Sequence, residues 1–181
     1  MQRFGPESAC CRVYTFKEGV LSNFAHDLKL EATEFEIEVS PTLVRGQFAA
    51  GSLRVVSALA NGLEAPQLLS PRDKRKIEQT IRETVLQAAH FDRVHFQSER
   101  VVLAPERCEI DGHLTLRGVT RRVALLAERR GQMLWATTLL HQPTFGIAPY
   151  SAMMGALRVQ PNVRVEVALP ARAISDLAQR D

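Results

Sequence analysis

Apolar and polar residues alternate along most of the chain, which is the pattern of β-strands that bury one face. The clearest case is the segment 162–169, where Arg164 and Glu166 separate apolar residues at every second position. The same alternation predicts strands in further segments: 12–16, 28–39, 43–49, 52–57, 94–103, 108–116, 122–128 and 133–140. Local hairpin connections dominate, so we expect a mainly antiparallel sheet.

Two of these strands change parity partway along. In 28–39 the apolar residues move from even to odd positions between Ala32 and Phe35, and a similar slip follows Ser98 in 94–103. Because a one-residue slip turns the side chains to the opposite face, each strand needs a β-bulge or a sharp bend at that point. Long bent strands are typical of barrels.

One helix interrupts the strands, and it is predicted at about 71–88. Ser70 is suited to cap its N-terminus, and Pro71 to occupy its first position. Three apolar residues spaced four apart form one stripe that we expect to be buried: Ile77, Ile81 and Val85. A shorter helix is predicted at 171–180.

About eight strands with one inserted helix predict an all-β fold, either an up-and-down antiparallel barrel or a closed sandwich. No repeat or linker divides the chain, so we expect a single domain over 1–181. A barrel of about eight strands is wide enough to be packed by its own side chains or to hold one small apolar ligand.

Composition is that of a globular protein, with 45% apolar and 24% charged residues among 181. Lys and Arg exceed Asp and Glu by 23 − 20 = 3, and no aromatic stripe is interleaved with basic residues, so no nucleic-acid partner is predicted. The longest apolar run, 152–157, falls short of the ~20 residues of a membrane span. The first nine residues lack the pattern of a secretory signal, which predicts a cytoplasmic location.

Motifs of catalysis are absent from the sequence: there is no GxSxG, HExxH, Walker A or GxGxxG pattern. The five histidines and three cysteines show no metal-ligand spacing, so no catalytic residue, metal or cofactor is predicted. His26 stands beside Asp27 and near Ser22, which leaves a hydrolase or isomerase as an alternative. The basic stretch 72–76 is suited to bind a phosphate or an acidic surface, or to form a solvated helix face.

Four segments carry a resemblance to one known family. The most specific is 112–123, which reads GHLTLRGVTRRV and is close to a hairpin motif G-x-L-T-hydrophobic-x-G-V-T-[RK]-x-V. Segments 21–27, 85–98 and 145–149 match further motifs of the same family in the expected order. On these residues the chain resembles the YceI-like family of lipocalin-like, polyisoprenoid-binding barrels.

The resemblance implies an eight-stranded antiparallel barrel around an elongated apolar pore, closed in part by the helix. Members with a known ligand hold an isoprenoid chain, as in a quinone or a prenyl lipid, and are often homodimers. Many members carry a signal peptide, which this sequence does not show, so the resemblance points to a cytoplasmic branch.

We therefore predict a non-catalytic protein that binds, carries or sequesters an isoprenoid or other long-chain lipid, with a homodimer as a candidate assembly. The alternatives are a filled barrel that acts as a structural or interaction module, and the hydrolase or isomerase noted above. We expect the pore to be lined by Phe24, His26, Leu28, Leu30, Phe35, Phe96, Leu114, Leu116 and Trp135. Candidate head-group contacts are Arg117, Arg121 and Arg122.

Overall fold

The protein is seen here in a computed structural model that describes residues 1–19, 26–104, 106–152, 154 and 157–171. Phe24 and nearly all of the helix predicted at 171–180 lie outside these residues. Within the described part of the chain, no helix is both long and apolar enough to span a bilayer.

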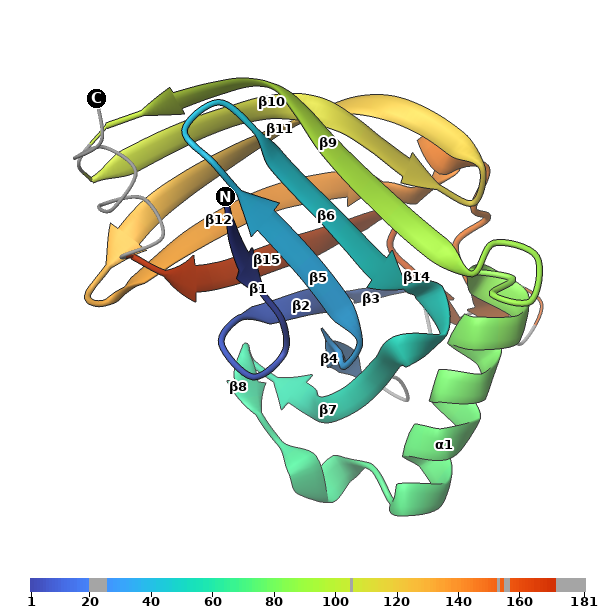
Figure 1. Ribbon diagram of the computed structural model, residues 1–181. Helices are drawn as coiled ribbons and strands as arrows, with labels where there is room; N and C mark the ends of the chain where they lie inside the picture. The colour runs from blue at the N-terminus through green and yellow to red at the C-terminus, as the bar shows by residue number, and fades with distance from the viewer. Residues whose placement is uncertain (20–25, 105, 153, 155–156, 172–181) are drawn as a thin grey trace.

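Most of the described residues belong to one strongly curled antiparallel sheet, as Figure 1 shows. Its strands follow one another across the sheet in this order: β1 (Gln2–Phe4), β5 (Phe35–Val39), β6 (Val44–Ala49), β9 (Arg93–Leu103), β10 (Arg107–Leu116), β11 (Val119–Arg130), β12 (Met133–His141), β15 (Asn162–Pro170), β2 (Cys10–Thr15), β4 (Asp27–Ala32), β7 (Leu53–Ala60) and β8 (Leu63–Glu64). A smaller sheet joins β13 (Ser151–Ala152), β14 (Leu157–Val159) and β3 (Lys17–Glu18).

The bend predicted between Ala32 and Phe35 is confirmed, and it explains how the sheet curls. It divides one long strand into β4 and β5, while the 3-10 turn η2 (Ala50–Ser52) divides its partner into β6 and β7. Hydrogen bonds cross the bend from the Thr33 amide to the Ser52 carbonyl, 3.2 Å, and from the Ala49 amide to the Glu34 carbonyl, 3.0 Å. Because β4 pairs with β2 while β6 pairs with β9, this bent hairpin links the two sides of the curled sheet.

The kink predicted after Ser98 is also confirmed. Asp111 of β10 pairs with Arg100 of β9 and Gly112 pairs with Ser98, so Glu99 is an extra residue in β9. This β-bulge keeps apolar side chains on the inner face on both sides of the slip.

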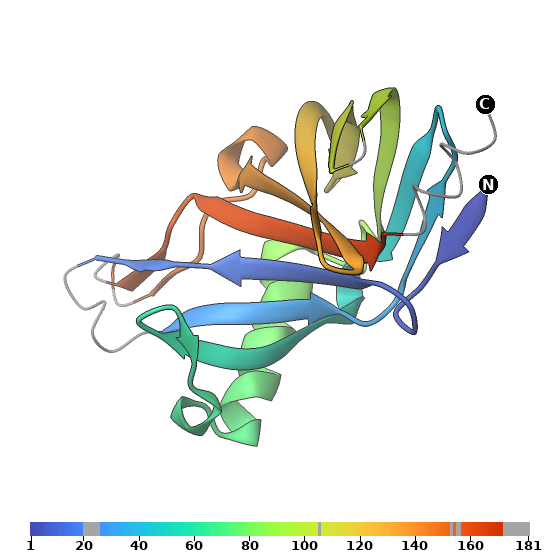
Figure 2. The same cartoon turned by 90° about the vertical axis from the view of Figure 1, so that its left-hand side faces the viewer.

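The all-β architecture with one inserted helix is confirmed, whereas the expected count of eight strands differs from the structure. The main sheet contains twelve strands among the described residues, because two bends each divide one strand and short edge strands β1 and β8 are added. Figure 2 shows β2, β4 and β7 side by side along one wall of the curled sheet, as their pairing requires.

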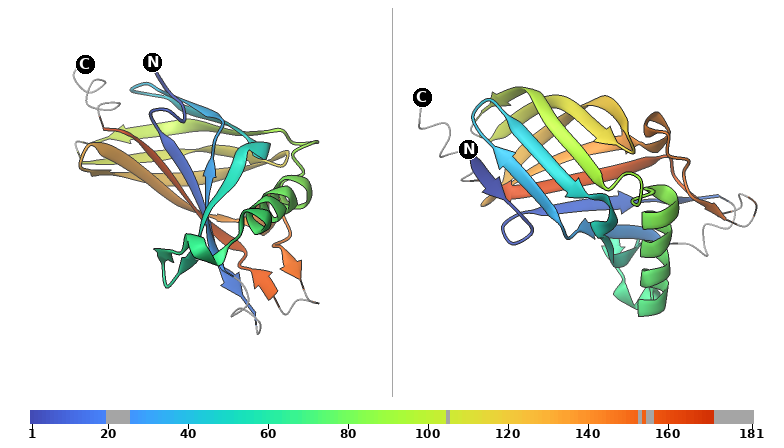
Figure 3. Two further views of the ribbon diagram at one scale, coloured as in Figure 1. Left: turned by 90° about the horizontal axis from the view of Figure 1, so that it is seen from below. Right: turned by 45° about the vertical axis from the view of Figure 1, so that its right-hand side comes forward.

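The helix is positioned at one end of the curled sheet, where it runs from the 3-10 turn η3 (Pro66–Leu68) to the start of β9 (Figure 3). It comprises α1 (Pro71–Thr80) and a π-helical turn η4 (Ile81–Val85), and thus ends three residues before the predicted boundary. Ser70 and Asp73 form a capping box, in which the Ser70 hydroxyl accepts from the Asp73 amide at 3.2 Å and the Asp73 carboxylate accepts from the Ser70 amide at 3.1 Å. The Ser70 hydroxyl also donates to the Asp73 carboxylate at 2.6 Å, and this bond, with a smaller contribution from the Ser70 amide, lowers the pKa of Asp73.

The apolar stripe of the helix departs from the sequence prediction. Ile77, Ile81 and Val85 were expected to be buried, but no residue of α1 or η4 is. All three side chains instead line an open cavity within the sheet, so water still reaches them. An empty space on the facing side therefore explains their partial exposure.

Candidate ligand cavity

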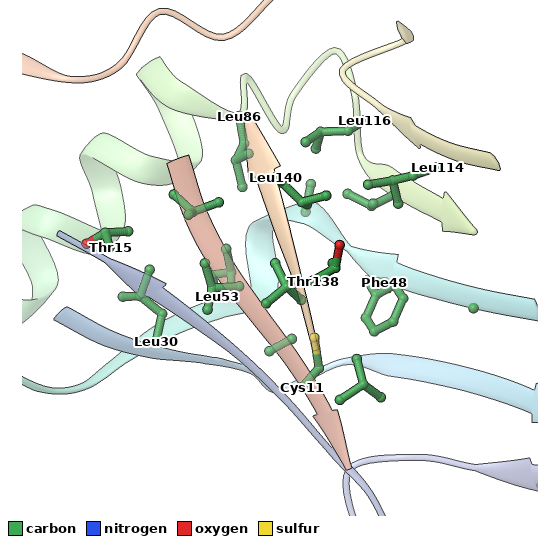
Figure 4. A pocket seen from close by; sticks show the side chains of 18 of the residues that line it. Cys11, Thr15, Leu30, Phe48, Leu53, Leu86, Leu114, Leu116, Thr138 and Leu140 are labelled. Atoms are coloured by element: carbon green, nitrogen blue, oxygen red, sulfur yellow. The ribbon is translucent and has the colours of Figure 1, made fainter. Parts of the chain in front are cut away.

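A cavity of about 660 Å³ lies inside the curled sheet. Its walls are the inward-facing residues of the strands, together with one face of the helix. Figure 4 labels ten of the wall residues, several of them from strands far apart in sequence, such as Leu30, Leu114 and Leu140. The volume falls within the ~300–1,000 Å³ of typical small-molecule pockets and far exceeds the voids of a packed core. The interior is therefore not filled by its own side chains.

The cavity has one buried end and one open end. At the far end Cys108 and Ile110 of β10 are buried, 1% and 7% exposed, whereas Leu116 at the other end of the same strand is half-buried. The wall of β12 follows the same trend from the buried Leu134 to the half-buried Leu140. Between Cys108 and Leu116, β10 spans roughly 26 Å at ~3.3 Å per residue. The cavity is thus elongated, with its mouth beside the helix.

The N-terminal segment helps to cover the buried end. The bend in β4 and β5 separates β5 from β2 there, and β1 pairs with the free side of β5. Phe4 and Ala9, 5% and 8% exposed, belong to the same apolar cluster as the cavity residues Cys11 and Ile37. This apolar cover makes the far end a blind end.

The wall is almost wholly aliphatic, and its polar groups are few. Thr138 lies midway along β12, and Thr15 lies toward the mouth; Figure 4 shows the oxygen of each side chain. Most other polar residues that line the cavity gather near the mouth, where the helix and the loops meet the sheet: His26, Asp73, Lys76, Thr80, Gln142 and Tyr150. Arg45, on β6, is an exception. Such a polarity gradient suits a molecule with a long hydrocarbon part and a small polar end.

Six of the nine residues expected to line the pore do so: His26, Leu28, Leu30, Phe96, Leu114 and Leu116. Phe24 lies outside the described residues. Phe35 is buried on the same face of β5 as the wall residues Ile37 and Val39 but does not itself line the cavity, and its ring stacks on that of the wall residue Phe48 with centroids 5.5 Å apart.

The expected position of Trp135 is wrong. Alternate residues of β12, Leu134 and Ala136, face the cavity, so Trp135 between them faces outward. Its indole ring lies under the Arg12 guanidinium, whose carbon is 5.4 Å from the ring centroid. A cation–π contact on the outer surface therefore holds this side chain.

This placement predicts that the fluorescence of Trp135 does not respond to lipid binding. Because Trp135 is the sole tryptophan of the chain and lies outside the cavity, we expect its emission maximum to stay unchanged when a non-absorbing lipid is added. Replacing Leu134 with tryptophan in a Trp135→Phe background moves the reporter to the inner face, and there a blue shift is expected. A shift of the wild-type emission alone contradicts the outward orientation.

The three arginines proposed as head-group contacts do not line the cavity. Arg117 donates to the Gly146 carbonyl at 3.0 Å and thereby holds the segment after β12 against the β10–β11 turn. Arg121 donates to the Thr120 carbonyl, and Arg122 lies 4.0 Å from Asp111 on the outer face. The polar groups of the mouth come instead from α1 and from loops, of which the sequence had marked only His26 and the stretch 72–76.

Two thiols face the blind end of the cavity. Burial raises the pKa of Cys11 to about 12 and that of Cys108 to about 11, with smaller effects from neighbouring thiols and carboxylates. Cys10 lies on the opposite face of β2 and is half-buried. The two cavity thiols are therefore protonated, unreactive wall groups.

These pKa values give two expected results. With iodoacetamide at about pH 8, Cys10 is the cysteine that reacts in the folded protein, while denaturation makes all three react, as mass spectrometry of peptides can measure.

The second result concerns stability. Unfolded thiols ionise above about pH 8.5, whereas the folded thiols stay neutral, so the free energy of unfolding falls as pH rises from that value toward 12. Cys11→Ala should reduce this slope. Rapid labelling of Cys11 in the native state contradicts the assignment.

The histidine at the mouth has no relay partner among the described residues. Asp27, its neighbour in sequence, accepts a hydrogen bond from the Lys17 amide at 2.8 Å, and Ser22 lies outside those residues. No group of three metal-ligating side chains occurs in the part of the chain that the structure describes. The geometry of the site supports binding of an apolar molecule and offers no specific support for chemistry on it.

A strongly curled antiparallel sheet around an elongated apolar cavity, with a helix beside its mouth, is a lipocalin-like fold. A sequence profile of the YceI-like domain matches residues 18–171. The chain belongs to the YceI-like family. A search of curated protein sequences found no match.

Solved structures show the same fold at low sequence identity. BcnA of Burkholderia cenocepacia superposes with a TM-score of 0.61 at 10% identity, covering 89% of this chain and 94% of that one. A polyisoprenoid binding domain from Saccharophagus degradans, implicated in plant cell wall breakdown, gives 0.57 at 11% identity, covering 89% and 91%. The YceI protein of Campylobacter jejuni gives 0.57 at 11% identity, covering 78% and 82%.

Proposed function

We propose that the protein binds one long-chain apolar lipid of the isoprenoid class in its cavity and carries or sequesters it. The observation that supports this proposal most directly is the unfilled, apolar cavity of about 660 Å³. A bound hydrocarbon would leave water at ~0.8 kcal/mol per methylene buried, which offsets the cost of ordering the chain. The apolar part would extend toward Cys108, and the polar end would stay at the mouth near His26 and Thr15.

The isoprenoid class is supported by the family and by one relative. The YceI-like domain covers the helix and all the cavity strands except β2, and the similar structure from Saccharophagus degradans is described as a polyisoprenoid binding domain. A branched chain also suits a wall of branched aliphatic side chains such as Leu30, Val165 and Val167. We infer that the protein acts by holding its ligand without converting it. The homodimer and the cytoplasmic location stay predictions.

The alternative of a filled barrel is not favoured, because the interior retains its cavity. The experiment that tests the proposal is organic extraction of the purified protein, followed by mass spectrometry of the extract. We expect an isoprenoid or other long-chain lipid in amounts comparable with the protein, after expression in more than one host. Extracts free of lipid from every host, together with no uptake of added polyprenol, contradict the proposal.

A further inference from the structure

We propose that the mouth of the cavity docks on an anionic lipid surface, through the basic start of α1 and the apolar side chains around the mouth. This inference rests on the proposed function, since a carrier of a poorly soluble lipid must load or unload where such lipids reside.

The basic charge is concentrated at the start of the helix. Segment 71–76 contains four cations and one acid, a surplus of 4 − 1 = 3 that equals the surplus of the whole chain. Lys74 donates to the Val56 carbonyl at 2.7 Å, but Arg72, Arg75 and Lys76 are exposed. None of these three takes part in an ion pair between described residues.

Arginines at the blind end of the cavity differ in this respect. Arg107 lies 3.1 Å from Glu109, Arg130 lies 3.6 Å from Glu128, and both pairs are on the outer surface. Their charges are balanced locally. Single exposed arginines without an ion pair among the described residues also occur elsewhere, at Arg45, Arg54 and Arg121, but the start of the helix groups three such cations within five residues.

Exposed apolar side chains lie on the rim of the same cavity that Lys76 lines. Leu68 and Tyr150 line the cavity, yet 40% and 41% of their surface remains exposed, which places them on its rim. Leu68 precedes the helix cap Ser70 by two residues. Met154 follows Tyr150 on the connection between β13 and β14, and its side chain is fully exposed. The rim thus combines apolar groups that can enter a lipid layer with cations that can meet anionic head groups.

This combination favours a membrane surface as the partner. Cations near an anionic leaflet gain attraction from its surface potential, and apolar side chains gain by leaving water for the interface. Docked in this way, the mouth would open toward the lipid layer, and the hydrocarbon chain would pass into the cavity with little exposure to water. In the protein free in water, the apolar side chains of the rim stay in contact with water, so they gain no such stabilisation.

Co-sedimentation with vesicles tests the proposal. We expect the protein to bind phosphatidylcholine vesicles that contain phosphatidylserine, and to bind at least about tenfold more weakly to phosphatidylcholine alone or at high salt. The double variant Arg72→Gln/Arg75→Gln should lose at least about tenfold in binding to the anionic vesicles, because neither residue lines the cavity but both are exposed cations. The control Arg107→Gln/Arg130→Gln removes equal charge at the blind end and should bind like the wild type.

A second pair of variants tests the apolar part. Met154→Ser should weaken vesicle binding, whereas Leu139→Ser, on the outer wall where Leu139 is 66% exposed, should not.

Measuring polyprenol uptake in solution separates this proposal from the proposed function of the cavity. If the wild type takes up polyprenol but does not bind anionic vesicles, the docking surface alone is overturned. The same holds if the mouth and blind-end charge variants lose equal amounts of vesicle binding. Vesicle binding without any polyprenol uptake overturns the cavity function and supports a surface contact.

Discussion

Replacing Ala136 with tryptophan is expected to weaken lipid binding roughly a hundredfold while the protein stays folded. Ala136 lies on the inner face of β12, opposite Ala127 and Val167 on the neighbouring strands. An indole at this position projects into open space, so it fills the cavity instead of straining a packed core. Displacing about four methylenes of the ligand at ~0.8 kcal/mol each costs about 3 kcal/mol, or roughly a hundredfold in Kd. Isothermal titration with a dispersed polyprenol measures this loss.

Thr137→Trp is the matched control, because Thr137 is the next residue of the same strand and faces outward. Tryptophan is well tolerated in strands, so both variants should keep the circular dichroism of the wild type. We expect a large difference in polyprenol affinity between Ala136→Trp and Thr137→Trp. If both variants bind polyprenol as tightly as the wild type, the ligand does not occupy the cavity.

Replacing Gly112 with alanine is expected to lower the free energy of unfolding by about 3 kcal/mol. Gly112 stands opposite the bulge in β9, and a Cβ atom there would lie 2.4 Å from the Gln97 carbonyl oxygen and 2.7 Å from the Ser98 Cα. Both atoms belong to the backbone of the paired strand, so neither can move without breaking the ladder. Urea unfolding followed by circular dichroism measures the change.

Gly46→Ala provides the comparison. A Cβ atom at Gly46 would lie 2.8 Å from the edge of the Phe48 ring, a side chain that can turn into the cavity. We expect a loss of about 1 kcal/mol or less for this variant. If Gly112→Ala proves as mild as Gly46→Ala, the bulge does not have the close backbone approach described here.

Much of the fold could be predicted because its signals are local. The parity changes near Ala32 and after Ser98 follow from alternation alone, and each corresponds to a bend or bulge in the structure. The cap at Ser70 depends on residues within one helical turn. The short edge strands β1 and β8, by contrast, depend on long-range pairing with β5 and β7, which no local pattern encodes.

The site was predicted less completely, for two physical reasons. Trp135 stands in the unbroken apolar run 133–136, so alternation did not indicate which residues face inward. The mouth is assembled from segments distant in sequence, with Leu68, Lys76 and Tyr150 brought together by the fold. The apolar stripe of the helix was recognised, but its partner is a cavity, and an empty volume leaves no residue in the sequence to indicate it.

Native mass spectrometry of the intact complex tests the central claim most directly, because it counts ligands per protein chain. After incubation with a polyprenol, we expect one bound lipid per chain for the wild type and for Thr137→Trp, and a much smaller bound fraction for Ala136→Trp. No bound lipid on the wild type, or the same lipid count on Ala136→Trp, would contradict a ligand held inside the curled sheet.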